Sequence, residues 1–335
     1  MSGGQGGGDG LPGPLRLPDP GELLDDESLD QLDFAGVLAL ARAFVDVDGV
    51  QQAAALGARV ATSDSAKLRT AGVLVTALVQ IAGKKPKDAL KSIQSVGESP
   101  DPDIAAEVLL MRGIAMHARR KWADADANYQ LAMMLRNGAT SGLAAIHLGF
   151  LRAGFGEEEQ AAQNFAAATT CGDPVVSAYA QLELALTLDR NGRRDAAIDR
   201  YRAALRSPHA NVALHAALNL AALLSEGGDP EAAEESRDLL ERVRATGHPG
   251  YAPKAALNLA VGRLEAGRTD GVVELLTVGT GSPDPAVAAL AHFHLGSCLA
   301  DPVQADRHLA IAEKTGSREI KRAASQARKL RRAAR

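Results

Sequence analysis

The residues best suited to chemistry lie near the C-terminus, where His294 and Cys298 are four residues apart and His308 follows them. Residues four apart share one face of a helix, so these side chains could offer three ligands of the kinds that bind zinc. No carboxylate or second cysteine completes the set, and helical spacing directs the neighbouring His292 elsewhere. Histidines in alanine-rich helices usually make one surface hydrogen bond. We therefore predict no metal site and no cofactor.

Motifs of the common catalytic classes are missing from the sequence. It contains no G-x-x-x-x-G-K-[ST] phosphate loop, no G-x-S-x-G, no H-E-x-x-H and no C-x-x-C. The acidic runs at 157–159 and 231–236 fall where helices are expected to begin, and acids there favour the helix dipole. The chain is predicted not to be an enzyme. An enzyme with its site in the last repeats is the alternative, and bound metal would reveal it.

The composition favours packed helices. Hydrophobic residues make up 46% of the chain but aromatic residues only 3%, so Ala, Leu and Val must build the core. Two cysteines form no disulfide framework, the N-terminus lacks the features of a signal peptide, and the longest apolar stretch, 71–83, is too short to span a bilayer. These features predict a cytoplasmic protein without a membrane partner. The richness in Ala, Arg and Gly points to a bacterial source.

A small residue recurs inside the apolar block of each expected first helix. The eight positions, called anchors below, are Ala41, Ala77, Gly113, Gly149, Ala185, Ala221, Ala260 and Gly296. Successive spacings are 36 residues, except for 39 between Ala221 and Ala260. A fixed period of this length is the signature of a stacked repeat architecture.

Two further markers keep the same phase. Alanine stands twelve residues after each of the first six anchors, at 53, 89, 125, 161, 197 and 233, and Val272 takes that place in the seventh repeat. Glycine stands seven residues after four anchors, at 156, 192, 228 and 267, where a left-handed residue would end the first helix. Proline in the breakers 99–103, 171–174, 207–211 and 282–285 is predicted near helix starts. Each repeat is therefore a predicted helical hairpin, and the stack supplies the core.

With these markers the sequence resembles the tetratricopeptide repeat (TPR) family over roughly residues 33–312. Aromatic residues at 129, 165 and 201 and Trp122 at a second-helix start fit that pattern. The period of 36 exceeds the usual period of about 34, and no large aromatic stands early in the first helix. The longer period and residues 218–260 are also similar to Sel1-like repeats. Both resemblances imply an all-α, right-handed α-solenoid of about eight stacked helix-turn-helix repeats that acts as a protein-binding scaffold.

In such a stack the first helices line the concave side, so residues at one first-helix position form a ladder. Two residues before the anchors, the ladder becomes polar in its second half, and an asparagine there could pair with a peptide backbone. The predicted partner-binding groove comprises His147, Glu183, Asn219, Lys254, Asn258 and His294. The alternative is that these are half-exposed helix residues without a ligand. The predicted partner is a protein or peptide segment.

The two ends of the chain differ in charge. Residues 1–21 are rich in Gly and Pro and are predicted to be disordered, and residues 22–32 are predicted to form an acidic helix or cap. The repeat array is expected over 33–315, followed by a basic capping helix over 316–335 with Ile320, Ala324, Ala327 and Leu330 on one stripe. As the alternative function, this basic helix would bind nucleic acid. Polar caps favour a monomer over an oligomer.

Overall fold

The computed structural model describes residues 31–46, 49–135 and 138–333. All the regular elements in these ranges are helices. The chain divides after Arg193 into two compact units, an N-terminal unit described over 31–193 and a C-terminal unit described over 194–333. The predicted disordered segment 1–21 and nearly all of the predicted acidic helix 22–32 lie outside the described residues.

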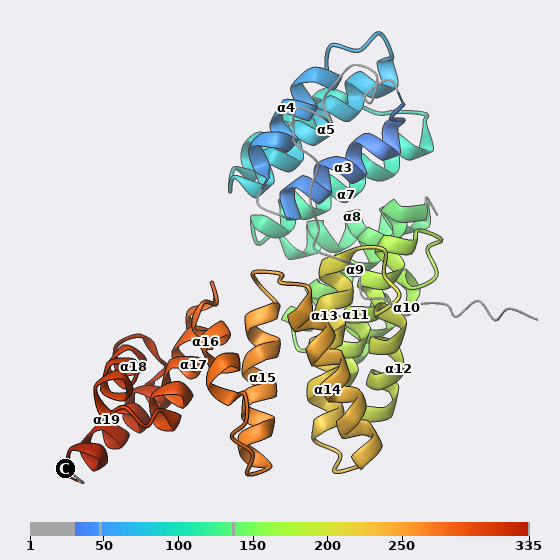
Figure 1. The fold of residues 1–335 in the computed structure, drawn as a ribbon. Coiled ribbons are helices and arrows are strands. Elements are labelled where there is room, and N and C mark those ends of the chain that lie inside the picture. The colour runs from blue at the N-terminus through green and yellow to red at the C-terminus, as the bar shows by residue number, and fades with distance from the viewer. Residues whose placement is uncertain (1–30, 47–48, 136–137, 334–335) are drawn as a thin grey trace, which may run out of the picture. The chain divides into compact units, whose positions relative to one another are not determined.

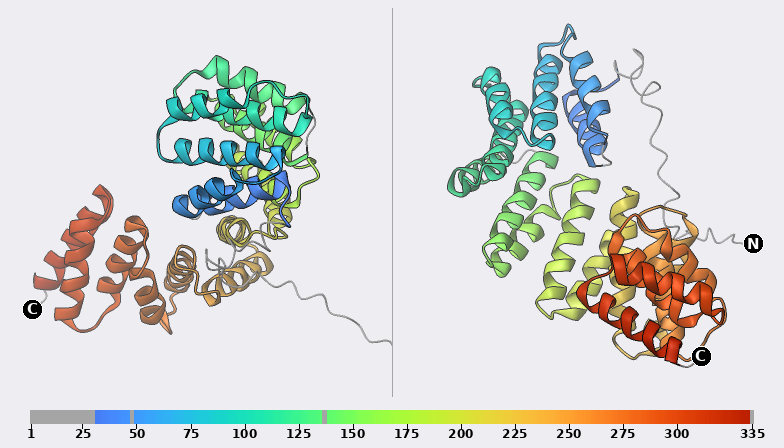
Figure 2. Two further views of the ribbon diagram at one scale, coloured as in Figure 1. Left: turned by 90° about the horizontal axis from the view of Figure 1, so that it is seen from above. Right: turned by 90° about the vertical axis from the view of Figure 1, so that its left-hand side faces the viewer.

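Each unit is a stack of antiparallel helical hairpins (Figure 1, Figure 2). The helices of the N-terminal unit are α3 (Phe34–Asp46), α4 (Val50–Val60), α5 (Ala66–Ala82), α6 (Pro86–Val96), α7 (Pro102–Ala118), α8 (Trp122–Met134), α9 (Gly138–Gly154), α10 (Glu158–Ala168) and α11 (Pro174–Arg190). Those of the C-terminal unit are α12 (Arg194–Ala204), α13 (Ala210–Ser225), α14 (Pro230–Ala245), α15 (Ala252–Glu265), α16 (Val272–Thr280), α17 (Pro285–Cys298), α18 (Pro302–Thr315) and α19 (Arg318–Ala333). The predicted all-α fold is confirmed.

The anchors lie on the faces where the first helices are buried, and the glycine anchors contact the second helix of their hairpin. All eight anchors are buried. A Cβ added at Gly113 would lie 2.5 Å from Cε1 of Tyr129, and one added at Gly149 would lie 2.6 Å from Cε1 of Phe165. The aromatic ring sixteen residues after the anchor therefore occupies the space that a side chain at the anchor would need.

The turns inside the second to seventh hairpins share one backbone conformation. The predicted turn glycines, including Gly156 and Gly192, have φ angles of about 70–77°, in the left-handed region that favours glycine. The same place in the second and third repeats is taken by Lys84 and Arg120, each with a φ of 59°. The hairpin geometry thus requires a left-handed residue at this position even where the sequence has no glycine.

Aspartate and proline start many of the helices together. Asp101, Asp173, Asp229, Asp284 and Asp301 each accept hydrogen bonds from backbone N–H groups of the first turn that follows. A proline comes directly after each of them, at a position where its missing N–H costs nothing. The prediction that proline in the four breakers lies near helix starts is confirmed; in 207–211 the proline, Pro208, lies two residues before α13 begins.

The basic helix α19 packs on α18. Ala324 is buried there, and Ile320 and Ala327 pack beside it. The guanidinium of Arg328 bridges two acids of α18, with Nε 2.8 Å from Asp306 and Nη1 2.6 Å from Glu313. Over the residues that the structure describes, no helix is long and apolar enough to cross a membrane.

Candidate functional site

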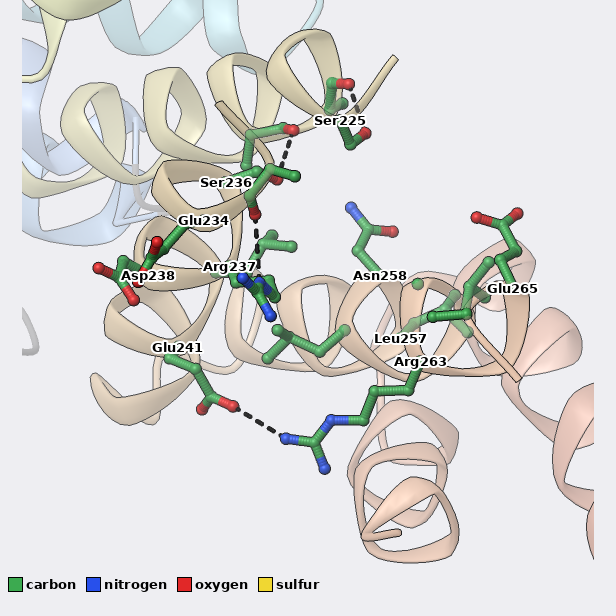
Figure 3. Close-up of a pocket in the computed structure, with 18 of the residues that line it drawn as sticks. Ser225, Glu234, Ser236, Arg237, Asp238, Glu241, Leu257, Asn258, Arg263 and Glu265 are labelled. Atoms are coloured by element: carbon green, nitrogen blue, oxygen red, sulfur yellow. Dashed lines mark hydrogen bonds and ion pairs between the residues drawn. The ribbon is translucent and has the colours of Figure 1, made fainter. Parts of the chain in front are cut away.

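A groove of about 1080 Å³ lies within the C-terminal unit, between the α13–α14 hairpin and α15 (Figure 3). The hydroxyl of Ser236 donates to the Ala221 carbonyl at 2.7 Å, which joins α14 to α13 and sets one wall. Leu257 and Leu290 are among the apolar side chains that line the groove, and Asn258 on α15 reaches into the space between the walls. The groove therefore combines an apolar lining with an accessible amide.

This groove coincides with the one break in the 36-residue register, between Ala221 and Ala260. The helix α14 that lies in this interval has 16 residues, whereas the other second helices of the described hairpins have between 9 and 14. Neighbouring first helices such as α5 and α7 pack directly on each other, but α13 and α15, both within the described chain, are not among the closely packed pairs. The longer spacing thus coincides with a longer α14 and with an opening of the stack.

The exposure of Ala233 reflects this opening of the stack. Its counterparts in the other repeats, including Ala197 and Val272, are fully buried. Ala233 is only partly buried and lines the groove. The marker of the sixth repeat therefore differs from the others in its exposure and lies at the groove.

The groove carries more acids than bases. Its acids are Glu226, Glu234, Asp238, Glu241, Glu265 and Asp270, and its bases are Arg237, Arg263 and Arg268, so six carboxylates against three guanidinium groups leave a net charge of −3. Arg263 is 3.5 Å from the carboxylate of Glu241 and donates to the Asp270 carbonyl at 2.9 Å. An excess of one sign of charge in a groove attracts ligands of the opposite sign.

Two of the predicted groove residues are asparagines, and their side-chain amides differ in how accessible they are to a ligand. Asn258 is exposed and lines the groove. Asn219 is half-buried on α13, and its Nδ2 donates to the His215 carbonyl of its own helix at 3.0 Å. One donor of Asn219 is thus engaged within the fold, whereas the amide of Asn258 is open to a ligand.

The predicted groove residues Lys254 and His294 also belong to the C-terminal unit but do not line this groove. The Nζ of Lys254 lies 3.4 Å from the carboxylate of Asp284. His294 is half-buried with its ring against Phe293; burial lowers its pKa, while the groove residue Glu265 acts in the opposite direction. His294 therefore lies near Glu265, outside the lining of the groove.

His147 and Glu183 lie in the other, N-terminal unit. The His147 ring stacks on Tyr129 with ring centroids 5.6 Å apart. Burial, with smaller contributions from the charges of His117 and Arg42, lowers its pKa to about 4. Burial also raises the pKa of Glu183, and a hydrogen bond from Tyr179 opposes this shift. Both residues are packed polar groups of α9 and α11.

The histidines near the C-terminus pair differently from the predicted set. Nδ1 of His292 lies 2.8 Å from Nδ1 of His308, so one ring donates and the other accepts. His308 thus pairs with His292, which helical spacing in the sequence directs away from the candidate set, and Cys298 is exposed at the end of α17. Among the described residues, no group of three or more His, Cys, Asp and Glu side chains is arranged to hold a metal ion.

Comparison by sequence gives no match to a protein family and none to a curated protein. Comparison of the structures shows similarity to the apo form of RapI, with 12% identity, a TM-score of 0.60, and coverage of 84% of this chain and 87% of that one. A protective antigen of uropathogenic Escherichia coli strains displaying an SLR fold matches with 14% identity, a TM-score of 0.48 and coverage of 92% and 82%. The human IFIT1 dimer with m7Gppp-AAAA matches with 16% identity, a TM-score of 0.45 and coverage of 88% and 73%. The likeness to RapI shows the fold, and the predicted helical-repeat architecture is confirmed.

Proposed function

We propose that this chain is a non-catalytic scaffold that binds an extended segment of a partner protein in the groove between the α13–α14 hairpin and α15. The observation that carries the proposal is the opening of the stack at the 39-residue spacing, where Asn258 is exposed above an apolar lining. An asparagine amide has both a donor and an acceptor, as a peptide unit requires. Leu257 and its neighbours offer apolar surface to side chains of the bound segment.

The groove can be blocked without disturbing the core. Ala222 is exposed on α13 and lines the groove, so Ala222→Trp places an indole where the ligand would lie. Ala286 is equally exposed on α17 but outside the groove lining, which makes Ala286→Trp the matched control. Peptides selected from a random 12-residue display library on the full chain would be measured against both variants by fluorescence anisotropy.

We expect Ala222→Trp to weaken binding of the selected peptides at least tenfold and Ala286→Trp to leave it within twofold. Asn258→Ala should weaken binding less, by the loss of one or two hydrogen bonds. Far-UV circular dichroism would verify that all variants keep their helicity. Selection of no peptide, or equal binding to the two tryptophan variants, would refute a peptide-binding groove at this place.

A second candidate function is nucleic-acid binding by α19, which one observation favours. Arg318, Lys321, Arg322 and Lys329 are all exposed and follow one side of this helix, away from the buried Ala324. Such a row of cations attracts phosphates with a strong dependence on salt. Changing these four residues to Gln should abolish salt-dependent binding of duplex and single-stranded probes if this function is correct.

The cytoplasmic location and the monomeric state stay predictions from the sequence. Sedimentation velocity over a range of protein concentrations would test the monomer.

A further inference from the structure

Three groove acids on α14 and α15 form no ion pair within the described part of the chain, and the same holds for Asp270, which follows α15. Glu226 is 3.4 Å from Arg194, and Glu241 is 2.7 Å from Arg244. For Glu234, Asp238 and Glu265, in contrast, the described residues provide no ion pair within 4.0 Å. These three exposed carboxylates therefore remain available to a ligand.

Two of the three groove bases are engaged within the fold, and the third, Arg268, leaves the six carboxylates in excess. Nε of Arg237 donates to the Ala233 carbonyl of its own helix at 3.3 Å, and Arg263 is engaged with Glu241 and with the Asp270 carbonyl. No lysine lines the groove. The negative potential of the groove thus arises from carboxylates that face solvent, where a ligand cation can reach them.

The acids Glu234, Asp238 and Glu265 lie at two ends of the groove. Glu234 and Asp238 are four residues apart on α14 and share one side of that helix. Glu265 lies at the end of α15, at the other end of the view in Figure 3, and Asn258 lies between. A ligand that meets both ends must therefore cross the amide of Asn258.

We propose that the groove binds an extended protein segment that carries a Lys or Arg toward each of its ends. This inference rests on the proposed function and names the chemistry of the partner. The terminal cations meet Glu234 and Asp238 at one end and Glu265 at the other, while the backbone between them meets the Asn258 amide. The apolar side chains of the lining, such as Leu257 and Leu290, accept the methylene stems of long basic side chains. A nucleic acid is disfavoured here, because its phosphates would face the carboxylates.

The test uses three labelled 12-residue peptides and the full chain. The first peptide has two lysines at each end of a Ser/Ala centre, the second has all four lysines at one end, and the third has glutamates in place of the lysines of the first. The groove variants are Glu234→Gln/Asp238→Asn and Glu265→Gln. The matched control is Asp195→Asn/Asp199→Asn on α12, which removes two exposed acids at the same spacing but outside the groove lining.

We expect the two-ended peptide to bind more tightly than the one-ended peptide, and the acidic peptide not to bind. Each removed groove carboxylate should weaken binding of the two-ended peptide by about two- to fivefold. With Glu265→Gln, the two-ended and one-ended peptides should bind with equal affinity. The control should change binding by less than about 1.5-fold. Added salt should weaken binding because it screens exposed charges.

Several results would overturn the inference. Equal binding of the basic and acidic peptides, no binding of the two-ended peptide, or no effect of the groove variants would each do so. If library peptides bind and Ala222→Trp blocks them, but they carry no excess of basic residues, then the proposed function stands and this inference fails. A dimer that Glu234→Gln/Asp238→Asn dissociates would assign the groove to the basic helix of a second copy instead.

Discussion

Nη2 of Arg42 on α3 lies 2.5 Å from Oε2 of Glu107 on α7 and joins the first and third hairpins of the N-terminal unit. The Glu107 side chain is 4% exposed, and its other carboxylate oxygen accepts a 2.6 Å hydrogen bond from the Thr140 hydroxyl on α9. A buried carboxylate is tolerated only where such donors replace the water that it loses. This contact therefore connects three hairpins through one side chain.

Arg42→Met should lower the free energy of unfolding by about 3 kcal/mol, because it leaves the buried Glu107 carboxylate without its cation. The double variant Arg42→Met/Glu107→Met should recover more than half of that loss, since no unpaired charge remains. Urea unfolding followed by far-UV circular dichroism would measure both. A double variant as unstable as the single one would show that packing, and not the unpaired charge, causes the loss.

Lys84→Gly and Arg120→Gly should each raise the free energy of unfolding by about 0.5–1 kcal/mol. Both residues have a φ of 59°, where a Cβ causes strain, and the benefit of relieving it exceeds the extra backbone entropy of glycine. Gly156→Ala at the equivalent turn should destabilise by about 1 kcal/mol. Thermal unfolding would rank the three variants, and a destabilised Lys84→Gly would mean that its side chain contributes more than the turn costs.

These turns also indicate how far the sequence could predict the structure. The regular spacing of Gly156 and Gly192 was enough to predict left-handed turns, but at Lys84 only the period, and not the residue type, indicated one. The groove had a comparable signal in the single 39-residue spacing. Its acidic wall on α14 could not be predicted, because first helices alone were expected to bind.

The sequence could not indicate which of the predicted groove residues other side chains cover, for a physical reason. Spacing along a helix places a residue on one face, whereas its contacts depend on side chains far away in sequence. Lys254 meets Asp284, and His147 meets Tyr129. Among the six predicted groove residues, only Asn258, near the 39-residue spacing, is exposed and lines the groove.

Gly149→Ala should destabilise the N-terminal unit by about 1–3 kcal/mol, because its Cβ would lie 2.6 Å from the buried Phe165 ring. The ring must then move out of its packed position. Gly149→Ala/Phe165→Leu should cost less than the sum of the two single changes, since a smaller side chain leaves room for the methyl group. Chemical unfolding of the four proteins would give this coupling energy, and strict additivity would contradict the steric explanation.

Acidification should destabilise the N-terminal unit through His147. Its pKa is lowered to about 4 in the folded chain, mainly by burial, against about 6.5 in an unfolded chain, so protons bind the unfolded state first. The contribution of His147 to stability is therefore complete above pH 6.5 and is lost as the pH falls toward 4, by about 3 kcal/mol in all. His147→Phe keeps a ring against Tyr129 but cannot titrate. Its unfolding free energy should depend less steeply on pH between 6.5 and 4 than that of the unchanged protein, and parallel pH profiles would show that His147 is protonated without cost.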